Sequence, residues 1–223
     1  MIIPLYRVPF RMVAKLPRNP TAVDNLKELG PQIRNVAPDL LWLRIYFRGG
    51  EHPTNWNSFR SYGPTNARFD HHRKPSALHK SRAILYSASN IRTCLAEVFQ
   101  DTRTIHTGRR DPWLATFDFE RPLRLLDLTG SWPTRAGASM KINTGPRASA
   151  RAWSRHFYDA FSTIDGIYYP SSMHANQPSI ALYERATSAL PGSPIDDRPL
   201  SDAMLLGDLK RAAEILNYEL WLG

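Results

Sequence analysis

The sequence has little of what covalent cross-links, membrane insertion or export require. Its 223 residues include a single cysteine, Cys94, which excludes an internal disulfide. No apolar run approaches the ~18 residues that can span a bilayer. The N-terminus also lacks an uninterrupted apolar stretch of signal-peptide length. We therefore expect a cytoplasmic protein, unless another route exports it, with no membrane contact and with Cys94 as an inert core residue.

Several familiar catalytic and phosphate-binding motifs are missing as well. The chain has no G-x-G-x-x-G after a strand and no G-K-[ST], which argues against a Rossmann or P-loop site. It has no G-x-S-x-G, which argues against a serine hydrolase of that type. His71, His72 and His79 lie in a polar, irregular segment with no cysteine nearby and no H-E-x-x-H. We expect these histidines on the solvated surface, and we expect no metal.

Acidic residues are the minority among the charges. The chain has 20 Asp and Glu and 29 Lys and Arg, which gives a net charge of +9. Of the basic residues, 23 are arginine. Arginine binds phosphates through two parallel hydrogen bonds, so the excess suits a nucleic acid, a phosphorylated small molecule or an acidic protein. The arginines are scattered instead of gathered on one predicted helix, so direct nucleic-acid binding is the weaker alternative.

What the sequence does contain is enough apolar material for one sizeable core, because 42% of the residues are hydrophobic. The spacing of apolar residues predicts a mixed α+β single domain, with residues 1–37 as an N-terminal extension and 38–223 as the main domain. Strands are expected at 41–47, at Ile84 and Leu85, and at 113–119, 123–128, 165–169, 180–183 and 218–222. Helices are expected at 21–29, after a Ser89 cap, from about Pro146 to Phe161, and at 202–216.

The segment 82–99, RAILYSASNIRTCLAEVF, is the most informative part of the chain. A strand carrying Tyr86 is followed by a turn and by a helix that places Glu97 at the border between core and solvent. The neighbouring helix positions 93, 94, 100 and 101 hold no basic residue that would pair with this carboxylate. Glu97 therefore suits the wall of a cleft, and an ordinary solvated glutamate is the alternative.

Six pieces occur in a fixed order between about residues 41 and 185. They are Arg44 in WLRIYFRGG, Arg68 in NARFD, Tyr86, Glu97, Ser171 in IYYPSS, and Asn176 in HANQPSIALYE. Together they resemble the RES-domain family of bacterial toxins. The typical pattern of that family has five parts, namely an arginine on an early strand, an arginine turn, a Leu-Tyr strand, an Ala-Glu helix and a late Pro-Ser.

The resemblance implies a split, mixed sheet like that of diphtheria-toxin-type ADP-ribosyltransferases, and it implies NAD as the substrate. NAD would be cleaved between nicotinamide and ribose by hydrolysis or phosphorolysis. By position, Glu97, Arg44 and Ser171 take the catalytic roles, with Ser172 as a neighbouring candidate for the serine. Arg44, Arg68, Tyr86 and Ser171 take the NAD-binding roles, without a metal.

The resemblance also implies a protein partner, an Xre-like antitoxin that covers the active site. The chain would form a hetero-oligomer with this antitoxin or a homodimer. Two other functions stay open from the sequence. One is an ADP-ribosyltransferase that modifies a specific protein, and the other is a non-catalytic basic module that binds nucleic acid. Dependence of nicotinamide release on Glu97 distinguishes the enzymes from the binding module.

Overall fold

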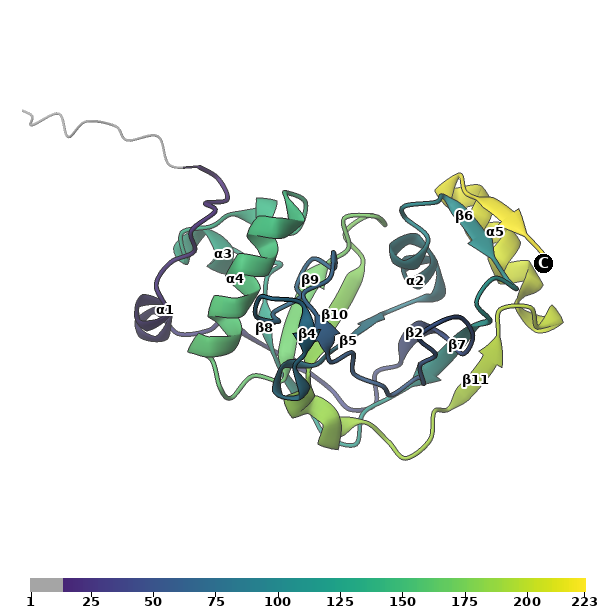
Figure 1. The fold of residues 1–223 in the computed structure, drawn as a ribbon, viewed down its shortest axis with the longest axis horizontal. Helices are drawn as coiled ribbons and strands as arrows, with labels where there is room; N and C mark the ends of the chain where they lie inside the picture. The colour runs from purple at the N-terminus through teal and green to yellow at the C-terminus, as the bar shows by residue number, and fades with distance from the viewer. Residues whose placement is uncertain (1–13) are drawn as a thin grey trace, which may run out of the picture.

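A large mixed β-sheet forms the centre of the fold in a computed structural model of the chain, which describes residues 14–223. Its eight strands follow the order β1-β8-β9-β10-β5-β2-β7-β11 (Figure 1). Only β8 and β9 are parallel, and all other neighbours are antiparallel. The strands are β1 (Ile33–Val36), β2 (Trp42–Phe47), β5 (Ile84–Ala88), β7 (Pro112–Phe117), β8 (Leu123–Asp127), β9 (Gly166–Pro170), β10 (Pro178–Tyr183) and β11 (Asp196–Pro199).

The sheet is split between its fifth and sixth strands, β5 and β2. β5 and β2 share a single register pair, Leu43 with Ala88, whereas β2 and β7 are paired along their whole length. The halves therefore diverge beyond that pair and leave room between them for a ligand. The predicted single-domain α+β fold with a mixed sheet is confirmed.

Helices pack against the two ends of the sheet (Figure 1). α1 (Val23–Leu29), α3 (Trp132–Arg135) and α4 (Arg147–Ala160) lie at one end, and α2 (Ile91–Val98) and α5 (Leu206–Leu216) at the other. Two small sheets pair β3 (Tyr62–Gly63) with β4 (Ala77–Leu78), and β6 (Thr104–His106) with β12 (Glu219–Trp221). Short 3-10 helices cover Lys80–Arg82, Met140–Ile142, Glu184–Ala189 and Ala203–Leu205. Within residues 14–223, no helix combines the length and apolarity needed to cross a bilayer.

The burial of aromatic side chains explains how α4 is held. Trp153 and Phe157 are completely buried and lie one helical turn apart, as the four-residue spacing predicts. They pack in one cluster with Trp132 and Ile167, so α3, α4 and β9 share a core. Burying side chains of this size stabilises the fold by about 1.5–3 kcal/mol each.

Two details differ from the sequence predictions. The helix cap is Asn90, not Ser89, because the Asn90 side chain accepts a hydrogen bond from the Thr93 amide at 2.9 Å. The helix expected from residue 202 begins with a 3-10 turn, and α5 itself starts at Leu206. The strand expected at 218–222 is present as β12, which pairs with β6 in a small separate sheet.

The segment before residue 38 contributes to the same sheet. β1 pairs with β8 through Ile33 and Leu126, α1 packs on α4, and Leu26 is fully buried. The boundary expected at residue 38 stays a prediction, with β1 on one side of it and β2 on the other. Residues 1–13 of the expected extension lie outside the described part of the chain.

Candidate active site

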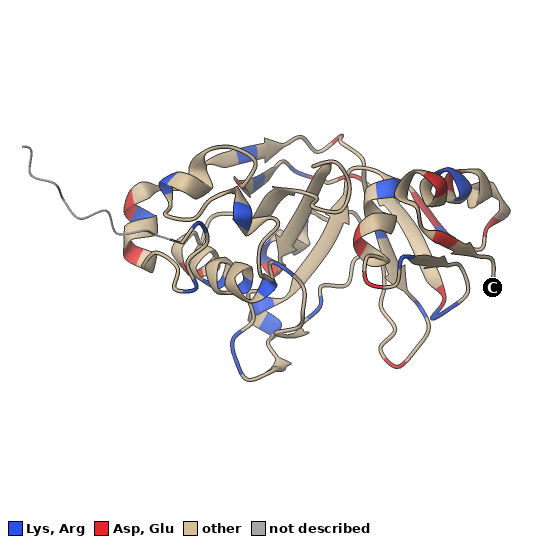
Figure 2. Cartoon of the chain, turned by 90° about the horizontal axis from the view of Figure 1, so that it is seen from above, with Lys and Arg blue, Asp and Glu red and all other residues tan. Residues whose placement is uncertain are grey.

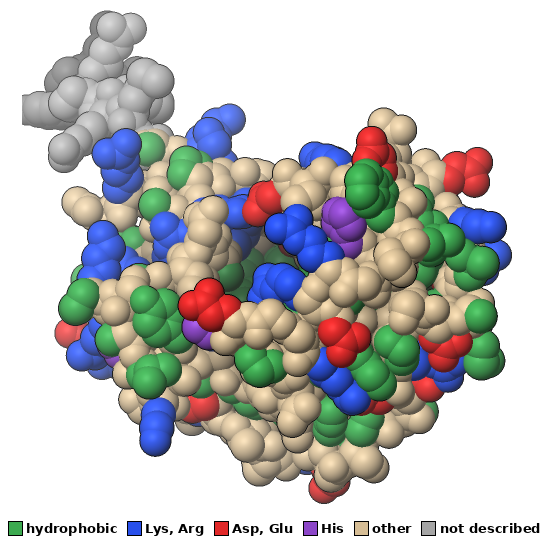
Figure 3. Space-filling view, turned by 45° about the vertical axis from the view of Figure 1, so that its right-hand side comes forward, with side chains coloured by type: hydrophobic (Ala, Val, Ile, Leu, Met, Phe, Trp, Pro, Cys, Tyr) green, Lys and Arg blue, Asp and Glu red, His purple; other side chains and the backbone are tan. Residues whose placement is uncertain are grey.

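A cavity of about 460 Å³ lies at the split in the sheet. Residues of β2 and β5 form its walls, α2 contributes Glu97, and the first residue of α4, Arg147, completes the lining. This volume falls within the range of sites that bind small molecules. Figure 3 shows a hollow in the middle of one face, with hydrophobic side chains in its depth and basic side chains at its rim.

Arg44, Arg68, Tyr86 and Glu97, which come from four separate segments, all line this cavity. Ser171 lies directly behind it and is completely buried. The structure thus brings together the five residues that the resemblance selected, and their chemical roles stay predictions. Ser172, the neighbouring candidate, also lines the cavity.

The hydrogen bonds of Ser171 distinguish it from Ser172. Its Oγ accepts hydrogen bonds from the amides of Met173 and His174 at 3.2 and 3.1 Å, and it donates to Oε1 of Glu97 at 2.6 Å. A hydroxyl has one hydrogen, so the two amides direct it at the carboxylate. The turn after β9 therefore fixes the position of Glu97 from across the sheet.

Glu97 is a partly buried carboxylate without a direct ion pair. Burial raises its pKa, and the hydrogen bond from Ser171 and the charges of Arg68 and Arg147 offset part of that effect. Among residues 14–223, no basic group lies within 4.0 Å of its oxygens. A carboxylate held this way keeps one oxygen available to a ligand, and its charge is weakly screened.

Two of the cavity arginines are held by backbone carbonyls. Arg44 on β2 donates to the Trp56 carbonyl at 2.8 Å, and burial lowers its pKa to about 10, which leaves it charged at neutral pH. Arg68 donates to the Gly145 carbonyl at 2.7 Å. Burial and the charge of Arg147 lower the pKa of Arg68. Hydrogen bonds to neutral carbonyls orient a guanidinium without cancelling its charge.

A third cavity arginine, Arg60, is neutralised by a buried network. Its Nη2 contacts Oδ2 of Asp70 at 3.0 Å, and Asp70 also accepts hydrogen bonds from Thr65 and from the ring of His72. These contacts hold the pKa of Asp70 far below its ordinary value, despite burial. The network thus orients one wall of the cavity.

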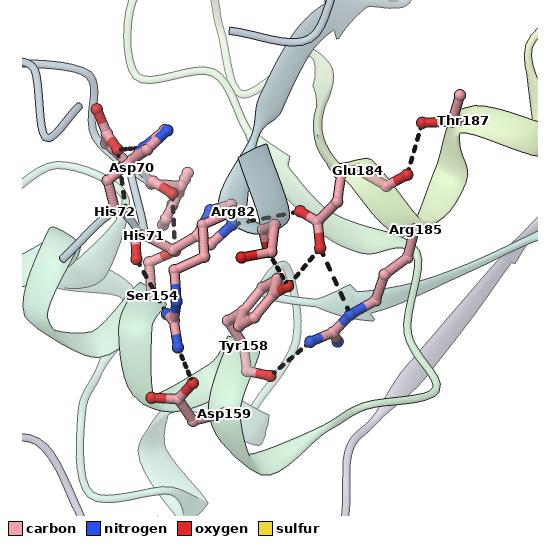
Figure 4. A network of polar contacts seen from close by, with 12 residues as sticks. Asp70, His71, His72, Arg82, Ser154, Tyr158, Asp159, Glu184, Arg185 and Thr187 are labelled. Atoms are coloured by element: carbon pink, nitrogen blue, oxygen red, sulfur yellow. Dashed lines mark hydrogen bonds and ion pairs between the residues drawn. The ribbon is translucent and has the colours of Figure 1, made fainter. Parts of the chain in front are cut away.

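The prediction of solvated histidines is wrong for His71 and His72, which are both 0% exposed. His71 stacks on Tyr158 with ring centroids 4.4 Å apart (Figure 4). Its ring also meets the Tyr183 ring edge-on. Glu184 lies 3.8 Å from its Nε2, and burial lowers the pKa of His71 to about 4. Residues 14–223 contain no cluster of three or more His, Cys, Asp or Glu arranged for a metal ion.

Tyr86 presents an aromatic surface to the cavity, and its hydroxyl has no hydrogen-bond partner within residues 14–223. The hydroxyl oxygen itself is fully buried, so the ring is the part of Tyr86 that a ligand in the cavity would contact. Cys94 also lines the cavity, but burial raises the pKa of its thiol to about 12. It is therefore a thiol at neutral pH and unsuited to be a nucleophile.

Sequence reasoning missed Arg60 and Arg147. Arg147 is the first residue of the helix that Pro146 predicts, which signals a helix start but says nothing about where that start points. The expectation of scattered arginines also overlooked α4, on which Arg147, Arg151 and Arg155 follow one another at four-residue steps. That these three arginines lie on one side of α4, with the first of them at the cavity, becomes clear only from the packing of the helix.

The chain belongs to the RES domain family, whose sequence model matches residues 41–202. This confirms the resemblance drawn from the motifs. The fold is similar to that of a chain in the crystal structure of the M. tuberculosis MbcT-MbcA toxin-antitoxin complex, with a TM-score of 0.52 and 15% identity. The similarity covers 80% of this chain and 91% of the other. No curated protein matches the sequence.

Proposed function

We propose that this protein is the toxin of a toxin–antitoxin pair and that it cleaves NAD between nicotinamide and ribose. Membership of the RES domain family and the similarity to a chain of a toxin–antitoxin complex support the first part. The observation that carries the second part is Glu97, a partly buried carboxylate that Ser171 holds at 2.6 Å inside an arginine-lined cavity. These side-chain types suit a dinucleotide and a cationic transition state.

The chemistry breaks the bond between ribose C1′ and the nicotinamide nitrogen. The bonding electrons stay with nicotinamide, which leaves uncharged, and positive charge develops on the ribose. The carboxylate of Glu97 holds a ribose hydroxyl and faces that charge, so it binds the transition state more strongly than the substrate. Tyr86 stacks on nicotinamide, and Arg44 contacts the ribose or its phosphates. Water or phosphate then forms the new bond to C1′ and loses a proton.

The proposed partner is an Xre-like antitoxin that covers the cavity. The net charge of +9 favours a partner segment rich in carboxylates. In Figure 2, basic residues predominate in the half of the molecule away from the C-terminus, and both signs mix in the other half. A protein that consumes NAD acts where NAD is abundant, which agrees with the cytoplasmic location expected from the sequence.

The experiment measures nicotinamide release from NAD by the purified chain, with and without phosphate. We expect Glu97→Gln, which keeps the size of the side chain and removes its charge, to lower the rate by about 100-fold or more. Glu28→Gln serves as the control because Glu28 is exposed on α1.

The outcomes separate the alternatives. A rate that rises with phosphate identifies phosphorolysis, and ADP-ribose found on an added protein identifies a transferase. If Glu97→Gln releases nicotinamide as fast as the wild type, the assignment of Glu97 is wrong. If the wild-type chain releases none, the proposed activity is wrong.

A further inference from the structure

We propose that Arg68 and Arg147 form a clamp for the diphosphate of the dinucleotide, an inference that rests on the proposed NAD-cleaving function. Arg68 belongs to the family motif, whereas Arg147 lies about 80 residues further along, at the start of α4. We call these two side chains the diphosphate clamp. Their shared ligand would be two adjacent phosphates, which carry two negative charges.

The two side chains are held at the same corner of the cavity. Arg68 donates from Nη1 to the Gly145 carbonyl, and Gly145 is two residues before Arg147. Both arginines line the cavity, and each is close enough to lower the pKa of Glu97. Arg147 also lowers the pKa of Arg68, so the two positive charges oppose each other in the free protein. A bound dianion removes that repulsion.

Neither guanidinium is neutralised by a close carboxylate. Among the described residues, Arg68 has no carboxylate within 4.0 Å, and the single acidic neighbour of Arg147 is Asp101 at 3.9 Å. The Asp101 side chain is 81% exposed, so water screens this pair. Arg60, by contrast, is already paired with the buried Asp70. The charge available for a ligand in this corner therefore belongs to Arg68 and Arg147.

Gln100 positions Arg147 from the end of α2. Its side-chain nitrogen donates to the Glu97 carbonyl at 2.6 Å, and its side-chain oxygen accepts a hydrogen bond from Nη2 of Arg147. One amide thus connects the backbone of the proposed catalytic residue with the guanidinium. This contact fixes Arg147 next to Glu97, where the phosphates joined to the nicotinamide ribose would lie.

The test measures binding of ADP-ribose, which contains the diphosphate, by calorimetry at low salt. We expect Arg147→Ala to weaken ADP-ribose binding roughly tenfold to hundredfold, because hydrogen bonds to charged groups contribute strongly. Arg147→Lys keeps the positive charge but loses the paired N–H donors of the guanidinium. Its affinity for ADP-ribose should therefore lie between those of the wild type and Arg147→Ala. Arg155→Ala is the matched control, since Arg155 lies two turns further along α4 and outside the cavity.

A second measurement separates the clamp from the activity. With NAD as substrate, we expect Arg147→Ala to raise KM by a larger factor than it lowers kcat, because the clamp binds the phosphates and affects the reacting bond only through the pKa of Glu97. Wild-type affinity for ADP-ribose in Arg147→Ala, or no ADP-ribose binding by the wild type, would overturn the clamp. Absence of Glu97-dependent nicotinamide release would instead overturn the proposed function.

Discussion

Ser171 affects the cavity through Glu97 and without lining the cavity itself. Its hydroxyl donates to the carboxylate and thereby favours the charged form of Glu97, against the effect of burial. Since the proposed mechanism uses the carboxylate, activity should fall as the pH decreases through the pKa of Glu97, which lies above its ordinary value of 4.5.

Ser171→Ala should therefore shift this acid limb to higher pH, because loss of the hydrogen bond raises the pKa of Glu97 further. The rate at neutral pH should drop about tenfold, as expected for a lost hydrogen bond to a charged group. The pH profile of kcat/KM for NAD measures both effects. Ser172→Ala should leave the limb in place, and an unshifted limb in Ser171→Ala would contradict the role assigned to this hydrogen bond.

His71 illustrates what the sequence cannot disclose about a single residue. Its neighbours His72 and Arg73 are polar, so the local pattern predicts exposure. Its burial results from Tyr158 on α4 and Tyr183 on β10, which lie far along the chain. The same holds for the cavity: motif order identified Arg44, Arg68 and Glu97, whereas Arg147 enters only through the packing of α4.

At the scale of elements, His71 makes the packing of α4 against β10 dependent on pH. Burial lowers its pKa from 6.5 to about 4, so the unfolded chain binds a proton in a range where the folded protein does not. The contribution of His71 to the free energy of unfolding is therefore fully present above pH 6.5, and it decreases as the pH falls towards 4. Between pH 7 and 5 the loss should be on the order of 2 kcal/mol.

Chemical denaturation at several pH values measures this loss. His71→Gln should flatten the dependence between pH 7 and 5, whatever its effect on absolute stability. Glu184, whose pKa is lowered below 4.5, loses its contribution only at more acidic pH and does not obscure the result. His52→Gln is the control, because the His52 side chain is 84% exposed. An unchanged slope in His71→Gln would show that other groups cause it.

Gly166 on β9 lies so close to the backbone of β10 that a side chain has no room there. A Cβ at this position would lie 2.2 Å from the Ala181 carbonyl oxygen, a backbone atom that cannot move aside cheaply. Gly166→Ala should therefore destabilise the fold by about 1–3 kcal/mol or more. Gly192→Ala provides the control, since nothing lies within 4 Å of its Cβ position. Equal unfolding free energies for the two variants would contradict this account.

The regular spacing of apolar residues made most helices and strands predictable. It gave no information about single turns and helix caps. The four-residue spacing of Trp153 and Phe157 indicated α4, and the alternation from Trp113 to Phe117 indicated β7. The cap of α2 was misplaced because Ser89 and Asn90 are both good caps, and the choice depends on which backbone adopts the extended conformation. The partner of β12 could not be predicted, since strand pairing is decided by tertiary packing.

At the scale of the whole molecule, the net charge of +9 governs how a partner approaches. Fixed charges attract an oppositely charged protein over about one Debye length, which is about 10 Å at 0.1 M salt. Part of the excess charge lies in a second pocket, which is lined by Lys74, Arg151 and Arg155. Two other residues of its lining, Thr65 and Ala148, are chain neighbours of Asn66 and Arg147, which line the cavity. Among residues 14–223, no carboxylate lies within 4.0 Å of the side chains of Lys74, Arg151 and Arg155.

This arrangement predicts that association with the proposed antitoxin slows as salt increases, and that the location of a charge matters more than the total. Lys74→Glu and Lys210→Glu change the net charge equally, and both residues are exposed. Lys74 lines the second pocket together with Arg151 and Arg155 of α4, whereas Lys210 lies on α5. Stopped-flow association rates at low salt should therefore fall several-fold more for Lys74→Glu. Equal effects would mean that only net charge attracts the partner, and a rate insensitive to salt would mean that the antitoxin binds elsewhere through apolar contacts.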